Sequence, residues 1–158
     1  MIPAATAPRW NDASMPKTYH LTRTMKAMTP TLNWMARSGM MGGAEVLTVR
    51  GRTTGEPRST PVTPLEHDGT LWLVSPYGIV AWVRNLRASG EATLTRRGTT
   101  RRFSAREASP EEAGPVLKRY VTAVSIVRPY FAAVPDDPTE AFVAEAAGHP
   151  VFALTEIR

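Results

Sequence analysis

One run of residues passes from a strand pattern through a tight turn and back into a strand pattern. It reads Val46-Leu47-Thr48-Val49-Arg50-Gly51-Arg52-Thr53-Thr54-Gly55-Glu56-Pro57-Arg58-Ser59-Thr60-Pro61. The β-branched start predicts a strand, and the glycines with Pro57 predict a short connecting loop. We therefore expect a hairpin whose returning strand spans residues 58–66. Because proline cannot donate a ladder hydrogen bond, Pro61 and Pro64 place that strand at an edge or a bulge.

Hydrophobic spacing predicts the remaining elements on either side of this hairpin. In chain order these are a helix at 25–38, strands at 46–49, 58–66 and 70–74, a helix at 79–86, strands at 92–97 and 100–107, a helix at 110–124 and a strand at 150–154. Short loops between strands favour an antiparallel barrel over alternating βαβ units. The expected fold class is mainly β with α (α+β), with residues 1–22 as an arm and 23–158 as one domain.

Composition limits the classes of function that remain open. The chain has 158 residues and no cysteine, so disulfides and thiolate chemistry are excluded, and redox chemistry would need a bound cofactor. No stretch approaches the roughly 18 apolar residues of a membrane span, so we expect a cytoplasmic protein. The three histidines are far apart and are expected at turns and on the surface. No metal site is therefore predicted.

Charge is distributed unevenly along the chain. Residues 1–106 carry a formal charge of +9 and residues 107–158 carry −4. A basic surface attracts nucleic acid, anionic lipid or a polyanionic small molecule, and charge alone does not choose among them. Few aromatic residues interleave with the arginines of residues 84–106, which favours a solvated strand face or a tail-binding patch over a nucleic-acid site. The apolar face of helix 25–38 either packs on the barrel or contacts a membrane surface.

The loop after the first strand is a candidate phosphate cradle. Its two glycines are expected to take positive φ and expose backbone N–H groups, while threonine hydroxyls and arginines add donors and charge. The candidate residues here are Arg50, Arg52, Thr53, Thr54, Gly55 and Arg58. An ordinary solvated hairpin loop is the alternative. Ser75-Pro76-Tyr77-Gly78 precedes the next helix and offers a second candidate anion or ring-carbonyl site at the helix N-terminus.

The same loop, followed by Trp82-Val83-Arg84-Asn85-Leu86 and the closing Pro150-Val151-Phe152, resembles the deazaflavin-dependent nitroreductase family. The resemblance implies a split β-barrel related to the FMN-binding pyridoxamine phosphate oxidases, binding coenzyme F420. It implies that Arg52, Thr53, Thr54 and Arg58 hold the phosphate and oligoglutamate tail. It also implies that the deazaflavin is lined by Pro61, Ser75 and Gly78, with Trp82 and Asn85 on the ring side and Tyr77 beside them.

The function implied by this resemblance is hydride transfer from reduced F420 to an enone, quinone or nitro compound. Tyr120 is the candidate residue to protonate or orient the acceptor. FMN is the alternative cofactor, because the chain departs from the family pattern at Thr53 and at residues 76–78. A non-catalytic deazaflavin-binding protein is a further alternative. The expected partners are a small-molecule acceptor and, if the chain is not a monomer, a second copy of itself, with no nucleic acid.

Overall fold

The computed structural model describes residues 44–158, so the predicted arm and the helix at 25–38 lie outside the described residues. In chain order the elements are β1 (Glu45–Arg50), β2 (Pro57–Val62), β3 (Leu65–His67), β4 (Thr70–Val74), α2 (Ala81–Ser89), β5 (Glu91–Arg96), β6 (Thr99–Glu107), α3 (Pro110–Ala123), η2 (Ser125–Tyr130), α4 (Thr139–Val143), η3 (Ala146–Gly148) and β7 (Val151–Ile157).

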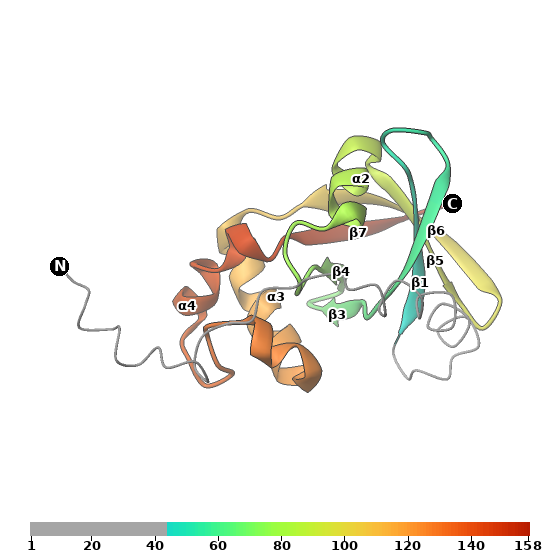
Figure 1. The fold of residues 1–158 in the computed structure, drawn as a ribbon. Helices are drawn as coiled ribbons and strands as arrows, with labels where there is room; N and C mark the ends of the chain where they lie inside the picture. Colours follow the sequence, from blue (N-terminus) through green and yellow to red (C-terminus); the bar gives the residue numbers. More distant parts are fainter. Residues whose placement is uncertain (1–43) are drawn as a thin grey trace.

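The strands form one antiparallel, seven-stranded sheet in the order β2-β1-β5-β6-β7-β4-β3. Three neighbouring pairs, β1–β2, β3–β4 and β5–β6, are hairpins, whereas β7 returns from the end of the chain to lie between β6 and β4. Helix α2 lies beside the β1–β2 turn, and α3 and α4 lie together on the other side of the molecule (Figure 1). The predicted fold class is confirmed, including the helix that precedes the last strand.

Alternation along the strands divides the apolar side chains between two cores. On β4, Leu73 points into a core shared with Leu47, Leu94 and Val83 of α2. Its neighbours Trp72 and Val74 belong to the other core, which the side chains of α3, η2 and α4 complete. The sheet therefore encloses one core inside the barrel and supports a helical layer on the outer face of β4 and β7.

Several predicted boundaries differ from the structure, three of them in ways that matter for the fold. The strand predicted at 58–66 is two strands, because Thr63-Pro64 separates β2 from β3. These two strands are the opposite edges of the sheet, as the prolines indicated. The helix predicted from residue 79 begins at Ala81, and Ile79 lies before it with 43% of its surface exposed. The last strand continues to Ile157, where it pairs with Arg102 of β6.

Helix α3 begins with a complete capping box. The Ser109 hydroxyl accepts a hydrogen bond from the Glu112 N–H, and the Glu112 carboxylate accepts one from the Ser109 N–H. Arg106 also donates to this carboxylate, and together these hydrogen bonds lower the pKa of Glu112 to about 2. Any contribution of the ionised Glu112 carboxylate to the stability of the folded protein is therefore complete above its ordinary pKa of 4.5. That contribution is lost as the pH falls towards 2.

We expect Ser109→Ala to lower the free energy of unfolding by about 1 kcal/mol, because one N–H of the first turn loses its acceptor. Urea denaturation at neutral pH measures the effect. Ser104→Ala is a suitable control, since the Ser104 hydroxyl is exposed and its one recorded contact, to the Thr155 carbonyl, is long at 3.5 Å. Equal denaturation midpoints for Ser109→Ala and the unaltered protein would contradict the prediction.

Candidate functional site

The loop between β1 and β2 is closed by its own hydrogen bonds. The Gly51 N–H donates to the Glu56 carbonyl at 2.7 Å, and the Gly55 N–H donates to the Gly51 carbonyl at 2.9 Å. Gly55 has a φ of +77°, as predicted, but Gly51 does not have positive φ. Gly51 is needed for another reason, because a Cβ there would lie 3.0 Å from the Glu56 oxygen. The loop is thus held in one shape before any ligand arrives.

Helix α2 fixes the same loop through Asn85. The Asn85 Oδ1 accepts two hydrogen bonds from Arg52, one from its backbone N–H at 3.1 Å and one from Nη1 at 2.8 Å. Asn85 is only 4% exposed, so its side chain has little freedom to move away. The sequence placed Asn85 on the ring side of the site, and the structure places its oxygen against the predicted phosphate loop.

Positive charge is left uncompensated around this loop. Within residues 44–158, no ion pair involves Arg50, Arg52 or Arg58. Four other arginines are paired: Arg87 with Glu107, Arg101 with Glu45, Arg102 with Glu91 and Arg106 with Glu112. Most of the basic cluster predicted at residues 84–106 is therefore neutralised, whereas the β1–β2 loop keeps its charge for an anion.

The second candidate loop, Ser75 to Gly78, is also closed. Ser75 is fully buried, and its hydroxyl donates to the Gly78 carbonyl. Its backbone N–H donates to the Pro150 carbonyl at 2.9 Å, which ties the loop to the start of β7. Because this loop leads directly into α2, and Asn85 of α2 holds Arg52, one helix positions both candidate segments.

Two ring-side candidates, Tyr77 and Trp82, lie around the beginning of α2. Tyr77 is 36% exposed and meets the ring of Tyr130 edge-on, with centroids 4.8 Å apart. Trp82 is partly buried and packs against Phe152, with ring centroids 6.0 Å apart. Pro61 lies on the edge strand β2, paired with Val46. Trp72 is a core residue, as the sequence predicted.

Tyr120 lies in the helical layer on α3 and is 3% exposed. Burial raises the pKa of its phenol, and the nearby Tyr77 raises it further. The hydroxyl therefore stays protonated across the physiological pH range. Because Tyr120 is so little exposed, an acceptor molecule would have to enter the helical layer to meet its hydroxyl.

Comparison with known protein families identifies the family of this chain. A model of the F420H(2)-dependent quinone reductases matches residues 21–135, which include both loops, α2 and α3. The chain belongs to this family. It is an F420-dependent oxidoreductase, and the cofactor and family implied by the β1–β2 loop are confirmed. No curated protein matches the sequence.

Solved structures with the same fold confirm the split barrel of this F420H2-dependent reductase. An F420-H2-dependent reductase, FDR-A, is 20% identical with a TM-score of 0.52, over 72% of this chain and 95% of that one. A domain-swapped dimer is 19% identical with a TM-score of 0.54, over 85% and 100%. A candidate pyridoxamine 5′-phosphate oxidase from Listeria innocua is 12% identical with a TM-score of 0.51, over 75% and 87%.

A partly buried pair, His149 and Glu145, lies beside the second loop of this reductase and was missed from the sequence. His149 stacks on Phe131, with ring centroids 4.0 Å apart, and its Nε2 lies 3.6 Å from a Glu145 oxygen. The Glu145 carboxylate also accepts hydrogen bonds from the N–H groups of Ala132 and Ala133. Burial alone would raise the pKa of Glu145, but these hydrogen bonds and His149 outweigh it and lower the pKa. His149 lies at the bend after η3, in keeping with the predicted turn, but its side chain is mostly covered by the protein.

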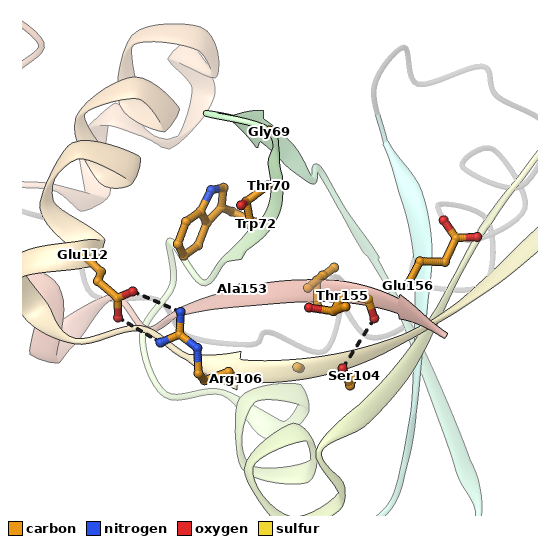
Figure 2. Close-up of a pocket in the computed structure, with 11 residues that line it drawn as sticks. Gly69, Thr70, Trp72, Ser104, Arg106, Glu112, Ala153, Thr155 and Glu156 are labelled. Atoms are coloured by element: carbon orange, nitrogen blue, oxygen red, sulfur yellow. Dashed lines mark hydrogen bonds and ion pairs between the residues drawn. The ribbon is translucent and has the colours of Figure 1, made fainter. Parts of the chain in front are cut away.

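A concavity of about 570 Å³ lies on the outer face of β4, β7 and β6, next to the first turn of α3. Figure 2 shows the Arg106–Glu112 pair at one side of it, with Trp72 above the strands and Ser104 beside Thr155. None of the predicted cofactor residues of the reductase lines it. The concavity is therefore separate from the two loops that α2 positions.

Proposed function

We propose that the β1–β2 loop holds the phosphate and oligoglutamate tail of F420, through Arg50, Arg52, Thr53, Thr54, Gly55 and Arg58. The observation that carries this proposal is the arrangement of Arg52. Its guanidinium is oriented by the buried Asn85, and no carboxylate within residues 44–158 neutralises it. An arginine fork that is already oriented, on a loop of fixed shape, suits a polyanion, because little ordering is left to be done on binding.

The ring of the cofactor is proposed to lie where α2 begins, lined by Pro61, Ser75, Tyr77, Gly78 and Trp82. Two features support this position. The Ser75 to Gly78 loop is locked to β7 and so offers a rigid wall. Gly78 has a φ of +95° and passes close to the Gly148 carbonyl, so the backbone is exposed where a side chain would be strained. Asn85 contributes to the same site by holding Arg52.

The proposed reaction is two-electron reduction of a quinone, with enones and nitro compounds as other electron-poor acceptors. Reduced F420, when bound, supplies the hydride, and one proton completes the reduction at the acceptor oxygen. The protein is proposed to bind the cofactor's tail, to position its ring against the rigid Ser75 to Gly78 loop and to exclude water. Burial keeps the Tyr120 phenol protonated, so it is proposed to donate a hydrogen bond to the acceptor.

The proposal is tested by titrating the purified chain with F420 and with FMN at two salt concentrations. We expect F420 to bind more tightly, and its affinity to fall as salt rises, because the contact is largely ionic. Stopped-flow reoxidation of bound, reduced F420 by a menadione-like quinone then tests turnover. Binding without reoxidation would favour a deazaflavin carrier, and preferential binding of FMN would favour a flavin oxidoreductase.

Tyr120→Phe tests the proposed role of the phenol. Because only the hydroxyl is removed, the packing of α3 should change little, and we expect quinone turnover to fall about tenfold while F420 affinity stays the same. Single-turnover kinetics measure the first quantity, and fluorescence titration the second. Unchanged turnover of every accepted quinone would remove Tyr120 from the mechanism.

Assembly and location remain part of the proposal. One similar solved structure is a domain-swapped dimer, and a homodimer is therefore the assembly to test beside the monomer. No helix within residues 44–158 is long and apolar enough to cross a bilayer. A cytoplasmic location stays a prediction. Membrane contact through residues 25–38 also stays a prediction, because those residues lie outside the described range.

A further inference from the structure

One carboxylate ties the chain between η2 and α4 to the residues that lead into β7. Glu145 accepts hydrogen bonds from the N–H groups of Ala132 and Ala133, at 2.9 and 2.7 Å. These two N–H groups follow η2 almost directly, whereas Glu145 lies between α4 and η3. The hydrogen bonds therefore hold the segment that leaves η2, defined here as residues 131–134, against the segment before β7.

His149 supports this carboxylate. Its ring stacks on Phe131 at an interplanar angle of 20°, and its Nε2 lies 3.6 Å from a Glu145 oxygen. Its Nδ1 is buried and has no hydrogen-bond partner among the described residues. An unpartnered buried nitrogen costs free energy, and phenylalanine would stack equally well without one. Packing therefore does not account for a histidine at this position, whereas the contact with Glu145 does.

The segment held by Glu145 is continuous with the aromatic side chains of the proposed reaction site. Tyr130, the residue before this segment, packs edge-on against Tyr77, with ring centroids 4.8 Å apart. Tyr77 in turn is near enough to Tyr120 to raise the pKa of that phenol. A loosening of residues 131–134 would therefore disturb Tyr130 and Tyr77 on the acceptor side of the site.

We propose that Glu145 and His149 are positioning residues for the hydride acceptor. By holding residues 131–134 in place, they keep Tyr130 against Tyr77 and so shape the pocket that receives the acceptor. Neither residue belongs to the β1–β2 loop, so binding of the F420 tail does not depend on them. This inference rests on the proposed function, because it concerns the acceptor side of the same site.

The tie depends on the charge of Glu145. Burial raises the pKa of this carboxyl, but the contact with His149 and the two N–H groups outweigh burial and lower it below 4.5. The stabilisation is therefore complete above pH 4.5 and is lost as the pH falls through the lowered pKa. The remaining titratable groups on neighbouring elements are exposed, contact other groups or are phenols: Tyr77, Lys118, Arg119, Tyr120, Arg128, Tyr130, Asp136, Asp137 and Glu140.

Glu145→Gln tests the positioning role, because glutamine keeps the size of the side chain but turns an NH2 group towards one of the two N–H donors. We expect amide exchange at Ala132 and Ala133, measured by NMR, to become about tenfold faster, the effect of losing one hydrogen bond to a charged group. The KM for menadione should rise by about threefold or more, because the competent pocket is less populated. The kcat and the F420 affinity should stay within about twofold.

Glu140→Gln is the matched control. Glu140 lies on the adjacent α4, is exposed and takes part in no ion pair within residues 44–158. The substitution removes the same charge from the same layer, so amide exchange, KM and F420 affinity should all remain as in the unaltered protein.

His149→Phe tests the contact with Glu145 while keeping the stacking on Phe131. Because the unpartnered Nδ1 is removed, thermal unfolding should show a protein that is no less stable. Burial of Glu145 is then opposed less, so its pKa should rise, and the acid limb of the menadione KM profile should move to higher pH. Glu145→Gln should have no such limb. A merely structural role of His149 would leave the pH profile in place.

The inference is overturned if amide exchange at residues 132 and 133 is unchanged in Glu145→Gln, or if its KM for menadione is unchanged. It is also overturned if the pH profile of His149→Phe coincides with that of the unaltered protein, or if Glu145→Gln loses F420 affinity, because the effect would then lie on the cofactor. Failure of the proposed function is distinguishable, since the unaltered protein itself would then fail to bind F420 or to reduce menadione, and this inference would fall with it.

Discussion

Arg52→Ala is expected to weaken F420 binding about 10- to 100-fold. Arg52 is the one arginine of the β1–β2 loop whose guanidinium the structure holds in place, through Nη1 and the Asn85 oxygen at 2.8 Å. Hydrogen bonds to charged groups contribute roughly 1.5–3 kcal/mol, which sets this range. Fluorescence titration of F420 measures the loss. The salt dependence of the remaining affinity should also become shallower, because one ionic contact is gone.

Asn85→Asp tests whether F420 binding needs only a correctly oriented Arg52 or also its free positive charge. An aspartate accepts the same two hydrogen bonds, so the loop should keep its shape while the guanidinium is neutralised. We expect F420 affinity to fall more in Asn85→Asp than in Asn85→Ala, because the added carboxylate also repels the anion. Arg87→Ala is the control for general loss of charge, since Arg87 is already paired with Glu107. Equal affinities for Arg52→Ala and the unaltered protein would remove the loop from the site.

Gly114→Ala is expected to destabilise the protein by about 2 kcal/mol. In most helices the same substitution is stabilising, because alanine has the higher helix propensity. A Cβ at residue 114 would lie 2.4 Å from a methyl group of Val143 and 3.3 Å from its backbone nitrogen. Helices α3 and α4 therefore approach too closely for any side chain, and the overlap outweighs the roughly 1 kcal/mol gained in helix propensity. Chemical denaturation measures the difference. Because α3 carries Tyr120, we also expect quinone turnover to fall.

Gly148→Ala is the matched control for this prediction. Gly148 lies in the same layer, but nothing is within 4 Å of where its Cβ would be, and it has no positive φ. Its unfolding free energy should therefore change by less than about 0.5 kcal/mol. If Gly114→Ala proved as stable as Gly148→Ala, α3 and α4 would have to be free to move apart at little cost.

Local sequence determined the elements and the chemistry of the first loop. The β-branched run of β1, the capping box at Ser109 and the left-handed Gly90 after α2 each depend on residues a few positions apart, and each is seen in the structure. The break at Thr63-Pro64 was missed because two prolines in one run indicate an edge without saying where pairing stops. The loop after β1 carried enough information to indicate the family and its cofactor.

Tertiary structure alone decided which of these groups meet and which charges remain free. Asn85 contacts Arg52, which is 33 residues away in the sequence, and His149 stacks on Phe131, although α4 lies between them in the sequence. Arg102 and Arg106 form ion pairs with Glu91 and Glu112, whereas no ion pair within residues 44–158 involves Arg52. A sequence pattern reports the local geometry of the backbone, but the partner of a side chain is set by the sheet order and register, which depend on the whole chain.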